Sequence, residues 1–229
     1  MKAVILAGGL GTRMSELTKT IPKPMVPILK KPIIIYIMEH YFEYGVNEFY
    51  VAIGYKGNEL IKFFKKNIYP WKVNLVNTGK KTMTGGRLKR LKKFLDKESF
   101  LLTYGDGISN VNIKKLISFH KKNKGYATIT AVRPPARFGA IKLQNNDVKF
   151  FREKSKLDEG WINGGFFVFE PEIFKFIKSD STYLEKEPME QLSLRKKLKA
   201  FKHNGFWQCV DTKRDRDLLE KQIKNKKNI

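Results

Sequence analysis

The sequence predicts an α/β fold, a Rossmann-like and mostly parallel sheet flanked by helices. Three observations favour this class. Through the first half of the 229-residue chain, short apolar runs of strand length alternate with amphipathic stretches of helical period. The first apolar run leads directly into a glycine-rich turn at residues 8–13. A later run, 100–104, is followed by Gly105-Asp106-Gly107, and open α/β sheets bind ligands beyond the carboxyl ends of their strands.

The first half is expected to follow the strand-then-helix order of a parallel sheet. The predicted strands are 3–6, 49–53, 73–76 and 100–104, and the predicted helices are 33–44, 59–66 and 88–95. From about residue 126 the pattern changes to shorter β-rich pieces, at 127–132, 140–143, 148–151 and 162–169. Helices near 171–177 and 188–196, a strand near 205–210 and a terminal helix complete the expected order.

Composition places the chain among ordinary soluble globular proteins, with 41% hydrophobic and 30% charged residues. No apolar run approaches the roughly 20 residues of a membrane span. Because the first predicted strand begins almost at Met1, we expect no leader. A cytoplasmic location is therefore the expectation. The single cysteine, Cys209, excludes an internal disulfide and a thiolate metal cluster, and its apolar neighbours predict a buried, inert thiol.

The net charge of +24 raises the question of a polyanionic partner. Only nine of the 46 basic residues are arginine, whereas specific phosphate and base recognition favours the arginine fork. The lysines are dispersed along nearly every predicted helix, which favours a solvated surface over a nucleic-acid interface. The basic run 221–227 is expected to be a fraying helix end or tail.

The turn at 8–13 is typical of phosphate binding. Gly8, Gly9 and Gly11 permit close approach of the main chain, and Arg13 adds fixed charge. A P-loop is excluded because no Gly-x-x-x-x-Gly-Lys-Ser/Thr is present, and a dinucleotide fingerprint because Met14 stands where its third glycine belongs. A plain strand-to-helix turn remains the alternative for the glycines alone.

A second candidate is Lys23, which lies between Pro22 and Pro24. Because proline restricts its own backbone and that of the preceding residue, Lys23 is expected in an extended segment with little main-chain freedom, positioned to meet an anion. Taken by itself, Lys23 is better interpreted as an ordinary surface lysine of a lysine-rich chain.

Two aspartates follow apolar runs: Asp106 after 100–104 and Asp211 after 206–210. Mg²⁺ is usually held by one or two carboxylates together with substrate phosphates, so this pair predicts a magnesium–phosphate site. A turn role for either aspartate, and a helix N-cap role for Asp211, are the competing interpretations.

Several longer motifs carry a resemblance. In order along the chain they are Gly8-Gly9-Leu10-Gly11-Thr12-Arg13, Pro22-Lys23-Pro24, Met83-Thr84-Gly85-Gly86-Arg87-Leu88-Lys89-Arg90, Thr103-Tyr104-Gly105-Asp106-Gly107, Arg137-Phe138-Gly139, Trp161-Ile162-Asn163-Gly164-Gly165 and Gly205-Phe206-Trp207-Gln208 followed by Asp211-Thr212. Together they resemble the sugar nucleotidyltransferases, and within that family the glucose-1-phosphate cytidylyltransferases, from residue 1 to about residue 220.

The resemblance implies a nucleotide-diphospho-sugar transferase fold in a single domain, 1–229, with a nucleotide-binding half at about 1–125 and a β-rich sugar-phosphate half at about 126–229. It implies transfer of CMP from CTP to glucose 1-phosphate with Mg²⁺ as cofactor, in lipopolysaccharide O-antigen biosynthesis, by a homo-oligomer. The catalytic residues would be Arg13, Lys23 and Asp106, and the metal ligands Asp106 and Asp211. Nucleotide contacts would come from Leu6, Ala7, Gly8, Gly9, Leu10, Gly11, Thr12, Arg13, Lys23, Thr84, Gly86, Arg87 and Gly105, and sugar-phosphate contacts from Gly139, Glu153, Lys154, Asn163 and Gly164.

The chain departs from the family pattern in two places. The segment 64–71 is shorter than the family's, which leaves the oligomeric contacts open, and Ser155 stands where proline usually follows the Glu153-Lys154 pair. Use of UTP or dTTP in place of CTP stays open, because the preference for cytosine is implied by resemblance alone. A catalytically inactive module that binds RNA or another polyanion through its lysines is the alternative from a different class. Tyr104 and Trp207 are expected in the core or at the pocket wall.

Overall fold

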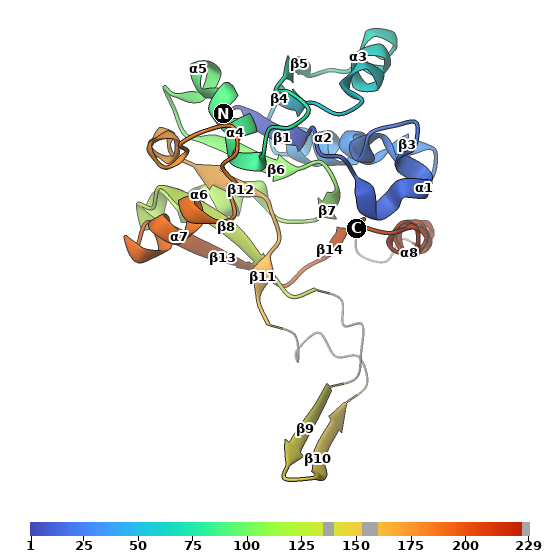
Figure 1. Cartoon of the computed structure of the whole chain (residues 1–229), viewed down its shortest axis with the longest axis vertical. Helices are drawn as coiled ribbons and strands as arrows, with labels where there is room; N and C mark the ends of the chain where they lie inside the picture. The colour runs from blue at the N-terminus through green and yellow to red at the C-terminus, as the bar shows by residue number, and fades with distance from the viewer. Residues whose placement is uncertain (135–139, 153–159, 226–229) are drawn as a thin grey trace.

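The computed structural model describes residues 1–134, 140–152 and 160–225. An eight-stranded sheet with helices on both faces forms its centre, which confirms the α/β class (Figure 1). The strand order is β11-β8-β12-β6-β1-β4-β5, and β13 pairs with β8. The strands are β1 (Ala3–Ala7), β4 (Glu48–Ile53), β5 (Lys72–Asn77), β6 (Phe100–Tyr104), β8 (Ala127–Val132), β11 (Ile162–Asn163), β12 (Phe167–Phe169) and β13 (Leu198–His203).

The first half of the sheet is parallel throughout, because β1 pairs in parallel with both β4 and β6, and β4 with β5. The second half is mixed: β12 is antiparallel to β6 and β8, whereas β13 runs parallel to β8. The carboxyl ends of β1 and β6 therefore meet at one edge, as expected for a ligand-binding edge.

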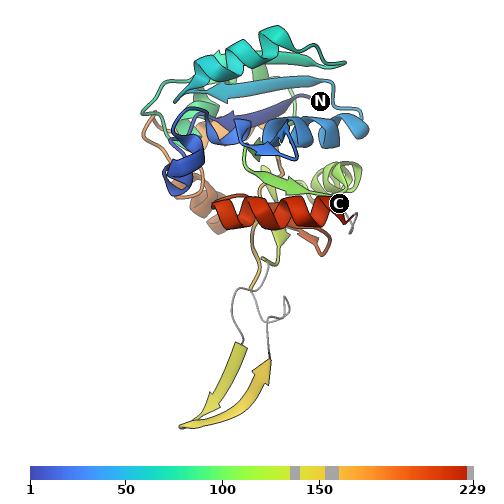
Figure 2. The same cartoon turned by 90° about the vertical axis from the view of Figure 1, so that its right-hand side faces the viewer.

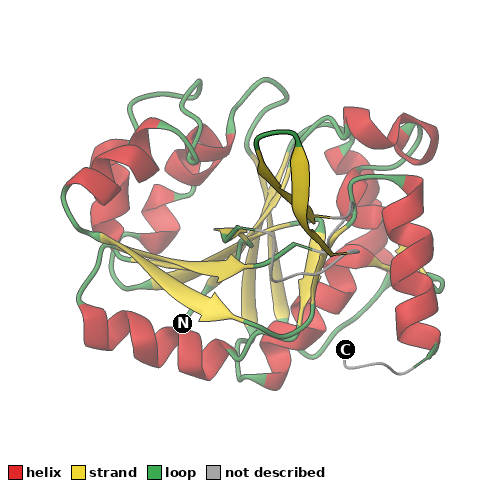
Figure 3. Cartoon of the chain, turned by 90° about the horizontal axis from the view of Figure 1, so that it is seen from below, coloured by secondary structure: helices red, strands yellow, loops and turns green. Residues whose placement is uncertain are grey.

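Helices lie on both sides of the sheet (Figure 3), and a hydrophobic core fills the space on each of its faces. Successive residues of β1 alternate between them, with Ala3, Ile5 and Ala7 in one and Val4 and Leu6 in the other, as strand geometry requires. Apolar faces of four helices cover the first core: α2 (Ile33–Glu43), α3 (Gly57–Lys66), α6 (Ile113–Asn123) and α8 (Lys213–Lys224). The second is covered by α4 (Thr84–Arg90), α5 (Lys92–Leu95), the 3₁₀ helix η4 (Pro171–Phe176) and α7 (Glu187–Leu194).

Three two-stranded sheets lie outside the main one: β2 (Pro27–Ile28) with β3 (Lys31–Pro32), β7 (Gly107–Ser109) with β14 (Trp207–Cys209), and β9 (Ala140–Gln144) with β10 (Asp147–Arg152). The β9–β10 hairpin projects from one end of the molecule (Figures 1 and 2). The β7–β14 pair matters most for the site, because it aligns Cys209 with Gly107 and lets the Val210 N–H donate to the Asp106 carbonyl at 2.9 Å.

Several element predictions were wrong in detail. The helix predicted at 88–95 begins at Thr84 and is divided at Leu91. The strand predicted at 162–169 is interrupted because Gly165 and Phe166 take positive φ angles of 74° and 48°, which no β-strand accommodates. The segment 205–210 contributes only β14, which lies outside the main sheet. Helix α6 and strand β13 are not among the predicted elements. Within the described residues no helix is both long and apolar enough to cross a membrane.

Candidate active site

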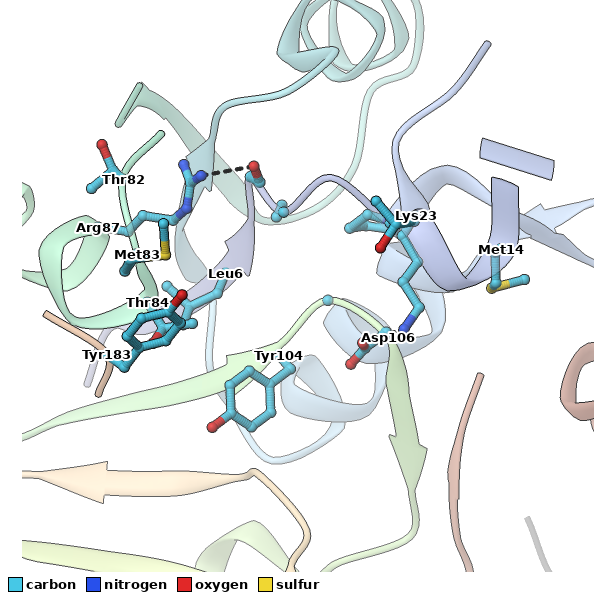
Figure 4. Close-up of a pocket in the computed structure, with 17 residues that line it drawn as sticks. Leu6, Met14, Lys23, Thr82, Met83, Thr84, Arg87, Tyr104, Asp106 and Tyr183 are labelled. Atoms are coloured by element: carbon cyan, nitrogen blue, oxygen red, sulfur yellow. Dashed lines mark hydrogen bonds and ion pairs between the residues drawn. The ribbon is translucent and has the colours of Figure 1, made fainter. Parts of the chain in front are cut away.

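A cavity of about 340 Å³ opens at the carboxyl ends of β1 and β6 (Figure 4). Most of the residues predicted to contact a nucleotide line it, namely Leu6, Ala7, Gly8, Gly9, Gly11, Thr12, Lys23, Thr84, Arg87 and Gly105. Asp106 also lines the cavity. Residues not predicted for it also line the cavity, namely Met14, Pro24, Thr82, Met83 and Tyr183, together with Tyr104, which the sequence had placed either here or in the core. Leu10 and Gly86 are not among the lining residues.

The glycine turn leaves β1 and continues into the short helices η1 (Thr12–Met14) and α1 (Ser15–Thr18). Gly11 has a φ of +66°, which explains glycine at this position. At Gly8 the reason is space, since a Cβ there would lie 2.1 Å from the Arg87 guanidinium. The Arg13 side chain lies outside the described part of the structure, so its predicted catalytic role stays a prediction.

The Arg87 side chain holds this turn in place through hydrogen bonds. Its buried guanidinium donates a hydrogen bond at 2.8 Å to the carbonyl oxygen of Gly8 (Figure 4). It also donates at 2.8 Å to the Gly79 carbonyl and to the Thr78 hydroxyl. Burial, with a smaller contribution from Arg90, lowers its pKa from the usual value. Arg87 therefore binds main chain of this protein and positions the turn, although it also reaches the cavity wall.

Lys23 lines the same cavity as the glycine turn. The expectation of an extended Lys23 was wrong: Pro22 is extended, and Lys23 opens the 3₁₀ helix η2 (Lys23–Met25), in which the Met25 N–H donates to the Pro22 carbonyl. The Lys23 ammonium lies 2.6 Å from an oxygen of Asp106 and 2.6 Å from an oxygen of Asp211. Burial alone would lower the pKa of Lys23, but attraction to Asp106 and hydrogen bonds to both carboxylates outweigh it and raise the pKa. Lys23 is therefore a charged, paired group.

The two aspartates converge although 105 positions separate them along the chain. Asp106 follows β6 and Asp211 follows β14 by two residues, and the β7–β14 ladder holds the two turns together. The N-cap interpretation of Asp211 was wrong. Thr212 caps α8, in a capping box with Asp215, which leaves the Asp211 carboxylate directed at Lys23.

This cluster suits a divalent cation. Ligand atoms of Asp106, Asp211 and Cys209 all lie within 4.8 Å of one another, and a cationic ammonium already bridges the two carboxylates. Carboxylate oxygens are the donors that Mg²⁺ prefers. Cys209 was expected to be buried, but its side chain is partly exposed. Burial, followed by the charge of Asp106, raises the pKa of its thiol.

The predicted sugar-phosphate residues are only partly described. Gly139, Glu153 and Lys154 lie outside the described residues. The Asn163 amide donates to the Tyr104 hydroxyl at 3.4 Å, and the Gly164 carbonyl accepts from the Trp207 indole at 2.7 Å, so both lie beside the carboxyl end of β6.

Glu185 was missed by the sequence analysis. It accepts hydrogen bonds from the Tyr104 hydroxyl at 2.7 Å and from the Thr84 hydroxyl at 2.6 Å, and so links two residues that line the cavity. Burial and the neighbouring Glu185 raise the pKa of Tyr104. Glu185 stands in a polar, charged stretch with no recognisable motif, so the sequence carried no signal for it.

Comparison with known proteins adds to this geometry. A family model described as "Nucleotidyl transferase" matches residues 2–226. A protein of Salmonella typhi named "Glucose-1-phosphate cytidylyltransferase" is 46% identical over 243 aligned positions, covering 96% of this chain and 95% of that protein. The crystal structure of HddC from Yersinia pseudotuberculosis complexed with GMP-PN is similar with a TM-score of 0.76 at 26% identity, covering 97% of this chain and 99% of that one. A UDP-glucose pyrophosphorylase complexed with UDP-glucose has the same fold, with a TM-score of 0.76 at 19% identity and 99% of each chain covered.

Proposed function

The chain belongs to the nucleotidyl transferase family, and from that premise we propose that it transfers CMP from CTP to α-D-glucose 1-phosphate, giving CDP-glucose and pyrophosphate. The 46% identity to the Salmonella relative over nearly the full length of both proteins supports this reaction. Within the structure, the observation that carries the proposal is Lys23 bridging Asp106 and Asp211 beside a cavity walled by a glycine turn.

The reaction needs positioning more than acid–base chemistry. The phosphate oxygen of glucose 1-phosphate is already an anion, so it can attack the α-phosphorus of CTP in line without a general base, and pyrophosphate leaves. The main chain at 8–12 would hold the triphosphate, and Lys23 and Arg13 would offset its negative charge. Lys154 would hold the sugar phosphate against repulsion from the nucleotide. The half up to about residue 125 would thus supply mostly nucleotide contacts, and the remainder mostly sugar-phosphate contacts.

Mg²⁺ is the proposed cofactor, held by Asp106 and Asp211. When bound, it would neutralise charge on the reacting phosphates. The residues themselves preorganise the site. The β7–β14 ladder holds the two strand-end carboxylates together, and the Lys23 ammonium balances part of their charge.

The proposal also covers the location of the enzyme, the use of its product and its oligomeric state. The substrates, a nucleoside triphosphate and a sugar phosphate, are metabolites of the cytoplasm, and we place the enzyme there. The product would feed sugar synthesis for a surface polysaccharide such as lipopolysaccharide O-antigen. A homo-oligomeric state is proposed from the family resemblance.

Pyrophosphate release from glucose 1-phosphate tests the reaction, with CTP, UTP, dTTP and GTP compared in Mg²⁺ and in EDTA. We expect CTP to give the highest kcat/KM and EDTA to abolish release. A preference for UTP or dTTP would correct the nucleobase, and no release with any nucleotide, together with steeply salt-dependent RNA binding, would favour the polyanion-binding alternative.

Asp106→Asn should lower kcat at least about 100-fold, because several kcal/mol of charge stabilisation are lost. Circular dichroism should show an unchanged fold. Asp147→Asn, on the exposed β9–β10 hairpin, is the matched control and should turn over like the wild type. Near-normal release by Asp106→Asn would refute the assignment of Asp106 to the metal site.

Lys154→Ala should raise KM for glucose 1-phosphate more than KM for CTP, because the lysine is assigned to the sugar phosphate alone. Steady-state kinetics with one substrate varied at a time separates the two effects. Equal increases in both constants would show that Lys154 is misassigned.

A further inference from the structure

A sulfur atom lies among the oxygen donors of the cation site. The Cys209 Sγ and one carboxylate oxygen each of Asp106 and Asp211 all lie within 4.8 Å of one another. Cys209 is partly exposed, and it is the single cysteine of the chain. The Lys23 ammonium contacts both carboxylates and balances part of their charge.

The backbone holds these three donors in place. Cys209 ends β14, where it pairs with Gly107, and the Val210 N–H donates to the Asp106 carbonyl at 2.9 Å. Asp211 follows two residues after Cys209 and so lies beside it at the end of the same strand. Ligands at the usual 2.0–2.3 Å from a tetrahedral metal lie about 3.3–3.8 Å apart, so the cluster needs to close by only about 1 Å.

The donor set is mixed in softness. Carboxylate oxygens suit Mg²⁺, whereas a thiolate selects softer ions such as Co²⁺, Zn²⁺ and Cd²⁺. A pair of aspartates with a non-coordinating residue in place of Cys209 would offer hard donors alone. Cys209 therefore places a soft donor beside two hard ones.

We infer that Cys209 is a third ligand of this cation site, so that thiophilic divalent ions bind Asp106, Cys209 and Asp211 together with a metal–sulfur bond. The inference rests on the cation site of the proposed function. On binding, the thiol gives its proton to water and a sulfur electron pair to the metal, while the Lys23 ammonium leaves the carboxylates still protonated. The net charge of the three ligands and the ion is then −1, the same as that of the three groups with Lys23 before binding.

Titration of the purified full-length chain with Co²⁺, without nucleotide, tests the inference. We expect a near-ultraviolet sulfur-to-cobalt charge-transfer band that saturates at one Co²⁺ per chain. Since the chain has one cysteine, the band can come from Cys209 alone. Cys209→Ser should abolish the band. Calorimetry should also show that the ratio of Co²⁺ affinity to Mg²⁺ affinity falls at least about tenfold, because losing even a residue that only hydrogen-bonds a metal ligand lowers metal affinity by about that much.

Two further variants locate the ion. Asp106→Asn should raise the Co²⁺ concentration at which the charge-transfer band is half-saturated. Asp147→Asn, on the β9–β10 hairpin, should leave that concentration unchanged. Stoichiometric Co²⁺ binding by the wild type without a charge-transfer band would overturn the inference and leave the Mg²⁺ assignment standing. A band in a protein that releases no pyrophosphate with Mg²⁺ would instead confirm the sulfur ligand and refute the proposed function.

Discussion

Two positive side chains at the cavity wall, Arg87 and Lys23, act in different ways. Arg87 spreads three hydrogen bonds over oxygens of two separate segments, as its planar fork allows. Lys23 places a compact charge between two carboxylates. The first residue therefore fixes the shape of the glycine turn, and the second fixes the charge between the two aspartates.

Arg87→Lys should destabilise the protein by about 2 kcal/mol, because an ammonium cannot reach all three acceptors and loses charge-assisted hydrogen bonds to the Gly8 carbonyl and the buried Thr78 hydroxyl. Urea unfolding followed by circular dichroism measures the loss. KM for CTP should rise as well, since the turn loses its support. Arg195→Lys, at an exposed position, is the control and should stay within about 0.5 kcal/mol of the wild type. Equal stability of the two variants would refute the positioning role.

The sequence predicted residue types at strand ends better than it predicted their partners. Asp106, Asp211, Lys23 and the glycines were found because each follows or precedes a recognisable apolar run or proline pair. The task of Arg87 was not predictable, because its acceptors are main-chain oxygens brought near by the fold. Likewise, Thr212 and not Asp211 caps α8, a choice that depends on the backbone angles at 212.

At the scale of elements, α4 depends on a close approach to the segment before α7. The N–H groups of Gly85 and Gly86 both donate to the Thr182 carbonyl, at 3.0 and 3.2 Å. A Cβ at Gly86 would lie 2.4 Å from the Asp180 carbonyl oxygen. Gly86 was predicted to contact the nucleotide, and the structure shows a packing reason for glycine there.

Gly86→Ala should therefore lower the free energy of unfolding by about 1–3 kcal/mol, since the clash is with main chain that has to shift. The shift in the thermal midpoint measures it. Gly160→Ala is the matched control, because a Cβ at Gly160 would meet no atom within 4 Å and its φ is not positive. An unchanged midpoint for Gly86→Ala would show that the Asp180 segment yields easily.

Element boundaries were less predictable than element types. Periodicity located β1, β4, β5 and β6 to within a residue or two at each end. It missed β13, whose lysines at 199 and 202 obscure any alternation, and it ran β11 and β12 together because the positive φ angles at 165 and 166 leave no mark in hydropathy. Helix α6 did carry a signal, with Ile113, Leu116 and His120 on one buried face.

At the scale of the whole molecule, two half-buried histidines couple stability to pH. His40 on α2 hydrogen-bonds the Val111 carbonyl, and His203 hydrogen-bonds the Phe206 carbonyl. Burial lowers the pKa of both, against smaller opposing effects of these hydrogen bonds and, for His40, of Glu43. The unfolded chain therefore binds protons at a higher pH than the folded chain does.

The contribution of the two neutral histidines to the free energy of unfolding should accordingly be fully present above pH 6.5. It should be lost as the pH falls from there toward their folded-state pKa values. Each unit of pKa lowering contributes about 1.4 kcal/mol. Urea midpoints at pH 8 and pH 5.5 measure the effect. The double variant His40→Gln, His203→Gln should lose most of this difference, and a wild type equally stable at both pH values would contradict it.

The class of the whole fold was predictable because it depends on the sum of many short patterns, none of which has to be placed accurately. The high net charge was the least informative global property, since a solvated surface and a polyanion site give the same composition. The convergence of Asp106 and Asp211 needed the β7–β14 ladder, a pairing between segments about 100 residues apart that no local pattern encodes.

Strand β1, shared by both cores, has a consequence for motion at the site. Its backbone is hydrogen-bonded on both edges and covered on both faces, so its amides should exchange with solvent deuterium only when the whole molecule unfolds. The glycine turn begins one residue after β1 ends. The boundary between global and local opening thus falls between Gly8, whose carbonyl accepts from Arg87 and from the Tyr55 N–H, and the exposed Gly9, so the outer part of the turn should exchange its amide protons while the sheet that carries it stays intact.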